Sequence, residues 1–208
     1  MNGPVVLRTS HLKRLNIGKR YWDARIHRIP EDAAHRPVLE AYLRDIEEHH
    51  AKGEGLFLYG EYSVGKTFAL SALAIAFVRM GYQAYVVQSA DLNEAIIKGL
   101  PFDAEQTVMD RCRTVDFLGI DDLGKEWLKK GSGFKEQAIE QLLRFRSREL
   151  LPTIITTNMN AETFKERYGE SAAAILLESM IDLQMEGADL RRAGYASRVG
   201  KFFEGLNG

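Results

Sequence analysis

Short apolar runs alternate with longer segments of helical periodicity along most of the chain. Four runs have the length and composition of buried strands, at residues 55–59, 84–87, 115–120 and 153–157. The last of them is rich in β-branched side chains, which favour strands. Residues 181–185 alternate apolar and polar positions and are expected to form a final strand.

Apolar residues at helical spacing fill most of the chain between these runs. The expected helices cover residues 37–52, 66–80, 89–98, 103–113, 134–150, 161–168 and 171–179. Pro37 suits a first helical position, and Gly53 and Gly81 suit helix ends. Alternating strands and helices predict an α/β fold with a mostly parallel sheet flanked by helices. Ligands of such folds bind beyond the carboxyl ends of the strands.

The first residues of the chain differ from the rest in pattern. Residues 1–35 are basic and irregular, and we expect an arm with at most a short helix. We expect a core at 36–192, followed by a glycine-containing tail at 193–208.

Composition narrows the class of protein further. The 208 residues carry a net charge of −1, so nucleic-acid contact would require a local basic patch. Cys112 is the one cysteine, which excludes an internal disulfide and favours a reducing cytosol. The N-terminus lacks the apolar core of a signal peptide, and no apolar stretch is long enough to span a bilayer. We therefore expect a cytoplasmic protein without a membrane partner.

A phosphate-binding loop lies between the first strand and the helix that follows it. The pattern Gly, four residues, Gly-Lys-Thr is made by Gly60, Glu61, Tyr62, Ser63, Val64, Gly65, Lys66 and Thr67. The glycines let successive N–H groups point at a phosphate, and the helix N-terminus adds partial positive charge. Lys66 would reach the β- and γ-phosphates of ATP, and the Thr67 hydroxyl would bind Mg²⁺.

Three polar residues near strand ends are candidate catalytic groups. Asp121 would hold Mg²⁺ through water, and Asp122 would polarise the attacking water. Asn158 follows the fourth strand and would contact the γ-phosphate or the water. Two plainer interpretations stay open. The aspartates suit an ordinary turn after a strand, and Asn158 suits the cap of the helix beginning near Ala161.

Basic residues suggest where DNA would bind. A glycine-containing loop gathers Lys125, Trp127, Lys129 and Lys130, where lysines would pair with phosphates and the indole would stack on a base. Residues 91–113 are a second candidate, and the basic arm could touch DNA or a partner protein. Ordinary solvated charge is the alternative for all three segments.

Beyond the phosphate loop, the chain resembles the AAA+ helicase loaders of the DnaC and DnaI type and the related IstB transposition helpers. The resemblance covers roughly residues 16–192. Its motifs are Asn16–Tyr21, Gly81–Val87 with Ala90-Asp91-Leu92, Asp121–Glu126, Pro152–Asn158 and Gly187–Arg191. It implies a P-loop NTPase of the AAA+ type, with Asn158 as sensor one and Arg191 in a sensor-two-like role at the nucleotide.

The chain departs from the family pattern in two places. Family members carry arginines after a Gly-Glu pair, one of them a finger into the neighbouring subunit's nucleotide, whereas residues 171–180 contain none. Because such a finger can raise turnover by orders of magnitude, we expect a slow ATPase or a finger from elsewhere, such as Arg167. The family's helicase loaders also carry an N-terminal domain, and only about 35 residues precede the first amphipathic helix here.

Three functions are compatible with these observations. The first is an ATPase that uses ATP and Mg²⁺ to load a replicative helicase onto single-stranded DNA as a helical or ring-like oligomer. The second is an IstB-like helper that prepares target DNA for a transposase. The third is a nucleotide-gated assembly factor with negligible turnover.

Overall fold

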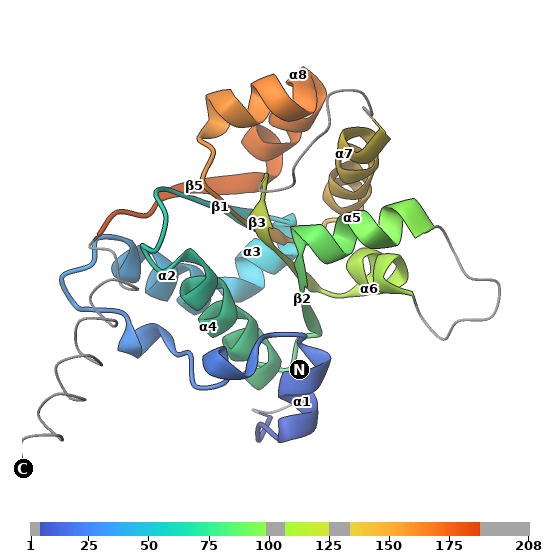
Figure 1. The fold of residues 1–208 in the computed structure, drawn as a ribbon. Helices are drawn as coiled ribbons and strands as arrows, with labels where there is room; N and C mark the ends of the chain where they lie inside the picture. Colours follow the sequence, from blue (N-terminus) through green and yellow to red (C-terminus); the bar gives the residue numbers. More distant parts are fainter. Residues whose placement is uncertain (1–4, 99–106, 125–133, 188–208) are drawn as a thin grey trace, which may run out of the picture.

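The computed structural model describes residues 5–98, 107–124 and 134–187 and contains one five-stranded sheet (Figure 1). The strand order is β2-β3-β4-β1-β5, and every neighbouring pair is parallel. The strands are β1 (Gly55–Tyr59), β2 (Ala84–Gln88), β3 (Phe117–Leu123), β4 (Thr153–Thr157) and β5 (Met180–Gln184). All five predicted strands are therefore present, in an order that places β1 and β4, far apart in the chain, side by side.

Helices cover both faces of this sheet. They are α1 (Thr9–Arg14), α2 (His35–Arg44), α3 (Ile46–Lys52), α4 (Lys66–Arg79), α5 (Ser89–Lys98), α6 (Val108–Thr114), α7 (Phe134–Arg148) and α8 (Ala161–Ser179), with short 3₁₀ turns at Lys19–Tyr21 and Ile26–Arg28. The segment from α1 to α4 packs on one face, and α5 to α8 pack on the other (Figure 1). No helix in the described ranges is both long and apolar enough to cross a bilayer.

The alternating sides of each strand form two separate apolar cores. In β1, Leu56 and Leu58 join the core beneath α4, and Phe57 joins the core beneath α7 and α8. The helix α4 approaches β3 closely at Gly119, where an added Cβ would lie 2.7 Å from Cδ1 of Leu70. Both faces of the central strands are therefore buried, which explains why their sequences are continuously apolar.

The N-terminal segment is packed against the sheet. Leu15, Ile17 and Ile26 are buried in the core beneath α4. The N–H of Val86 donates to the carbonyl of Leu15 (2.9 Å), and Asn16 Nδ2 donates to the carbonyl of Val86 (2.9 Å). The segment thus covers the open edge of β2, a feature that a basic arm alone does not predict. The boundaries at 35 and 192 stay a prediction.

Three elements differ in detail from the sequence-based prediction. The first amphipathic helix is interrupted at Asp45, so that α2 and α3 replace a single helix at 37–52. The two helices expected at 161–179 form one segment, α8, with a kink at Gly169 (φ 89°). Strand β3 continues through Asp121 and Asp122, with an irregularity in its pairing to β4 between Ile120 and Leu123.

A buried arginine ties α7 to α6 and to the starts of β3 and β4. The side chain of Arg146 is fully buried and donates to the Thr153 hydroxyl and to the carbonyls of Cys112, Val115, Asp116 and Pro152. Burial lowers the pKa of its guanidinium to about 10, so it remains charged at neutral pH. It occupies the carbonyls that the end of α6 would otherwise leave without a partner.

Candidate phosphate-binding site

The predicted phosphate loop joins the carboxyl end of β1 to the N-terminus of α4. Ser63 and Gly65 have positive φ angles of 67° and 99°, which curl the loop ahead of the helix. Gly60 has φ 149°, and an added Cβ there would lie 2.2 Å from the carbonyl oxygen of Met185. Glycine is needed at this position because the loop passes so close to the backbone that follows β5.

The side chain of Lys66 folds back over the loop. Its Nζ donates to the carbonyls of Gly60 (2.7 Å) and Glu61 (2.5 Å), and the residue is only 6% exposed. A buried ammonium held near helix α4's N-terminus provides the positive charge that a phosphate requires. Of the other predicted loop residues, Val64 is buried and Tyr62 is 65% exposed.

Asp121 is the centre of a buried hydrogen-bond network. Its Oδ1 accepts from the hydroxyls of Thr67 (3.0 Å) and Thr156 (2.5 Å), and its Oδ2 accepts from Nε2 of Gln88 (2.7 Å). The residue is 1% exposed. The fold therefore brings together the two groups predicted to bind Mg²⁺, Thr67 and Asp121, from two different elements.

The backbone of Asp122 adopts a left-handed conformation. Its φ is 59°, its N–H donates to the Thr156 hydroxyl (2.9 Å), and its carbonyl accepts from Ser89 Oγ (2.9 Å). This conformation accompanies the pairing irregularity of β3. The alternative of an ordinary turn after the strand is therefore wrong, because β3 continues to Leu123.

Asn158 lies with the phosphate loop around one cavity. The cavity of about 1000 Å³ is lined by Tyr59, Gly60, Glu61, Tyr62, Val64, Asn158, Asn160, Thr163 and residues 184–187. The alternative role of Asn158 as a helix cap is wrong. Asn160 caps α8, because its side chain accepts from the N–H of Thr163 (2.9 Å). Asn158 is thus left half-buried beside the loop.

Several predicted site residues lie outside the described parts of the chain. These are Lys125, Trp127, Lys129 and Lys130 of the predicted DNA-contacting loop, and Arg191 of the sensor-two-like motif. Arg167, considered as a source of the missing finger, donates to the carbonyl of Gly124 (2.6 Å) and lies over the Tyr168 ring. It is therefore engaged within its own chain.

The donor set suits Mg²⁺ rather than a metal held by protein alone. Among the described residues, no group of three or more His, Cys, Asp or Glu side chains could hold a metal ion. Mg²⁺ is commonly bound by one or two protein oxygens together with phosphates and waters. The adjacent oxygens of Thr67 and Asp121 fit that requirement.

Two residues of this network were missed in the sequence. Gln88 ends β2, and Thr156 lies within β4, where a threonine also suits an ordinary β-branched strand position. Their contacts to Asp121 depend on β2, β3 and β4 being neighbours in this order. Of the two, only Gln88 could have been recognised in the sequence, because it is a polar residue at the end of an apolar run.

A parallel sheet in this order, with a glycine loop between β1 and α4 and acids on β3, is that of a P-loop NTPase of the AAA+ type. The crystal structure of the DnaC helicase loader superposes with a TM-score of 0.71, at 22% identity, over 81% of this chain and all of that one. A structure of the replication initiator DnaA bound to AMPPCP and single-stranded DNA gives 0.61 at 15% identity, over 81% of this chain and 51% of DnaA.

The sequence itself is similar to one replication protein. The replicative helicase loader DnaI of Bacillus subtilis (strain 168) is 28% identical over 117 residues. The match spans 56% of this chain and 37% of DnaI, so only about a third of that relative is represented. No protein-family model matches the chain. The resemblance to DnaC/DnaI-type loaders is thus confirmed in sequence and in fold.

Proposed function

We propose that this protein is an ATP-binding AAA+ protein that loads a replicative helicase onto single-stranded DNA. The observation that carries the proposal is the sequence match to the helicase loader DnaI. The hydrogen bond between Thr67 and Asp121, within the fold of the DnaC loader, supports it.

ATP would bind at the phosphate loop, residues 60–67. Lys66 would exchange the carbonyls of Gly60 and Glu61 for phosphate oxygens, and Thr67 and Asp121 would hold Mg²⁺. Mg²⁺ would neutralise charge on the phosphates. The AMPPCP in the similar DnaA structure supports a nucleoside triphosphate as the ligand. Arg191 would approach the same nucleotide.

Hydrolysis at this site would be slow. Asp122 would polarise the attacking water, and Asn158 would contact the water or the γ-phosphate. No arginine stands in residues 171–180, so this segment offers no finger for a neighbouring subunit. This observation favours the alternative of a nucleotide-gated assembly factor, in which ATP mainly controls assembly into a helical or ring-like oligomer and turnover is negligible.

The partners follow from the same comparison. A replicative helicase is the partner that the name of DnaI indicates, and the single-stranded DNA in the DnaA structure supports a DNA ligand. DNA would reach the loop that carries Lys125, Trp127, Lys129 and Lys130. Such a protein would work in the cytoplasm.

A capture experiment tests the proposal. The tagged full chain is incubated with ATP and Mg²⁺ and offered a purified replicative helicase and, separately, a transposase. Retention of the helicase, lost in the Lys66→Ala variant, is the expected result. Retention of the transposase alone would favour the IstB-like alternative. Retention of neither, with ATP-dependent oligomers in light scattering, would favour the assembly factor.

A further inference from the structure

A second cavity lies at the end of the sheet opposite the phosphate loop. It measures about 590 Å³ and borders the end of α4, the start of β2 and the start of β3. Its polar and aromatic lining residues are His11, Arg14, Tyr82, Gln83, Arg111 and Thr114. Two of these, Arg14 and Arg111, are positively charged, and none is acidic. The volume falls in the range of about 300–1,000 Å³ that is typical of ligand sites.

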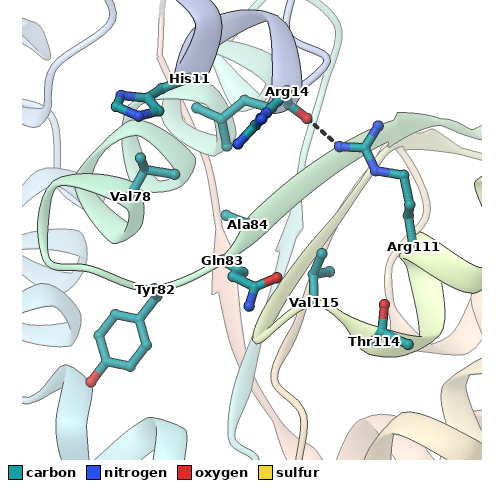
Figure 2. Close-up of a pocket in the computed structure, with 10 residues that line it drawn as sticks. His11, Arg14, Val78, Tyr82, Gln83, Ala84, Arg111, Thr114 and Val115 are labelled. Atoms are coloured by element: carbon teal, nitrogen blue, oxygen red, sulfur yellow. Dashed lines mark hydrogen bonds between the residues drawn. The ribbon is translucent and has the colours of Figure 1, made fainter. Parts of the chain in front are cut away.

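The fold brings two basic segments together here. Figure 2 shows His11 and Arg14 of α1 on one side of the cavity and Arg111 and Thr114 of α6 on the other. The Arg111 guanidinium donates to the carbonyl of Arg14, 97 residues away in sequence, which joins the two elements (Figure 2). Each segment alone could be solvated charge, but their convergence on one concave surface is a tertiary feature.

The basic groups are held in place by neutral partners. Arg111 lies 3.9 Å from the centre of the Tyr85 ring, so its planar fork is fixed while other N–H groups remain for a ligand. The backbone N–H of Arg8 donates to Nδ1 of His11 (3.1 Å), which leaves Nε2 to carry the proton of the neutral ring. In the described part of the chain, neither Arg14 nor Arg111 forms an ion pair.

The surroundings add positive potential. The buried guanidinium of Arg146 occupies the carbonyls of Cys112 and Val115 behind the cavity wall, which reduces the negative end of α6. The neighbouring carboxylate of Asp116 accepts the backbone N–H of Gln83 (2.7 Å) and lies 4.0 Å from Nε2 of His50. Burial and the nearby carboxylates of Glu47 and Asp116 raise the pKa of Tyr82 on this side of the cavity. No carboxylate is among the residues that line the cavity with Arg14 and Arg111.

We propose that this cavity binds a phosphate of a single-stranded nucleic acid, with Arg14 and Arg111 as the main contacts. Arginine forks match phosphate geometry, and both guanidinium groups lie at this one cavity. Tyr82 also borders the cavity, with its ring packed against His50 and Phe117. The site extends the proposed function, and the choice of a nucleic acid as its ligand rests on that function. The cavity lies away from the proposed nucleotide site. An acidic peptide is the competing ligand.

The test measures binding of a fluorescein-labelled oligo(dT) of about 20 nucleotides by anisotropy, over a series of salt concentrations. The Arg14→Ala, Arg111→Ala double variant is expected to bind at least about tenfold more weakly. Its plot of log affinity against log salt should be shallower by about 1.4, because each lost single-strand phosphate contact removes about 0.7. Binding of ATP should be unchanged.

The matched control is the Arg44→Ala, Arg148→Ala double variant. It removes the same charge from two arginines that pair with Asp45 and Glu149 on the surface, and it should bind as the native chain does. Equal weakening in both double variants would overturn the site. The single variant Arg14→Ala keeps the backbone carbonyl that accepts from Arg111, so the contact between α1 and α6 is retained. It therefore tests the site even if the double variant is unstable.

Competitors distinguish the ligand. Unlabelled oligo(dT) should displace the probe from the native chain, whereas thymidine monophosphate and inorganic phosphate at matched charge should not. Displacement by the free anions would overturn the assignment to a polynucleotide. Binding of poly-L-glutamate that is lost in the double variant, with oligo(dT) binding retained, would assign the cavity to an acidic protein. If this cavity does not bind nucleic acid, capture of the helicase should still be observed. The two experiments therefore distinguish failure of this site from failure of the proposed function.

Discussion

The Thr67 hydroxyl donates a 3.0 Å hydrogen bond to Oδ1 of Asp121, although 54 residues separate them in the chain. One residue begins α4 and the other lies near the end of β3. The contact requires β1 and β3 to flank β4 in the sheet. If the two residues bind Mg²⁺ as proposed, this contact would hold both oxygen ligands in place before nucleotide arrives, and such preorganisation lowers the cost of binding.

Replacing Lys66 tests the nucleotide site. Lys66→Ala removes a charged donor near the phosphates, and charged hydrogen bonds are worth about 1.5–3 kcal/mol each. We expect the affinity for ATP with Mg²⁺ to fall about a hundredfold in isothermal titration calorimetry. Lys52→Ala removes a lysine that pairs with Glu48 on the surface and should leave the affinity unchanged. Equal affinities for Lys66→Ala and the native chain would refute the site.

Replacing Thr156 tests the network around the acids. Thr156→Val keeps the shape of the side chain but leaves Oδ1 of Asp121 and the N–H of Asp122 each short of a partner. We expect a loss of about 2 kcal/mol in the free energy of unfolding and a melting temperature lower by roughly 5 °C. Circular dichroism measures both.

The control for this variant is Thr163→Val, which removes an exposed hydroxyl that bonds to Asn160. It should shift the melting temperature far less, because water can replace the lost partner. Similar shifts in the two variants would mean that Thr156 does not hold the acids in place.

The proposed catalytic role of Asp122 can be tested separately from its left-handed backbone conformation. Asn tolerates the left-handed backbone at this position about as well as Asp, whereas Ala costs about 1 kcal/mol or more. If Asp122 polarises the water, Asp122→Asn should keep ATP affinity and stability while hydrolysis falls about a hundredfold or more. Single-turnover phosphate release measures the rate. Native turnover in Asp122→Asn would exclude this role.

Arg146 is expected to contribute strongly to stability, because it joins α7 to α6 and to the starts of β3 and β4. Arg146→Met leaves four carbonyls and the Thr153 hydroxyl without their buried donor. We expect a loss of about 4 kcal/mol in urea unfolding, in the range for breaking a buried charge network. Arg144→Met removes a surface pair with Glu140 and should cost less than about 1 kcal/mol. Comparable losses would contradict the structural role.

Cys112 gives a direct readout of unfolding. Burial raises the pKa of its thiol from 9.0 to about 12, so at pH 8 the native thiolate is about a thousandfold scarcer than in the unfolded chain. Iodoacetamide should therefore label the native protein far more slowly than the urea-unfolded protein. Above about pH 9 the unfolded thiol ionises first, so stability should fall as pH rises. Fast native labelling would contradict this burial.

The local pattern of the sequence determined much of this protein. Four apolar runs predicted four of the strands, because parallel strands buried on both faces are apolar throughout, and the alternation at residues 181–185 predicted the fifth. The spacing of Gly60, Gly65 and Lys66 predicted the loop between β1 and α4, since that backbone path needs glycine at defined positions. Resemblance to DnaC and DnaI added the expectation of an AAA+ type of P-loop fold, without an order for the strands.

Only the tertiary structure decided which polar groups meet. The partners of Asp121 come from α4, β2 and β4, and no local pattern distinguishes Thr156 from an ordinary strand threonine. The same holds for the cavity between α1 and α6, whose basic residues are unremarkable until Arg14 and Arg111 converge. Sequence periodicity reports which side of an element is buried. It does not report which elements become neighbours, because that depends on packing across the whole sheet.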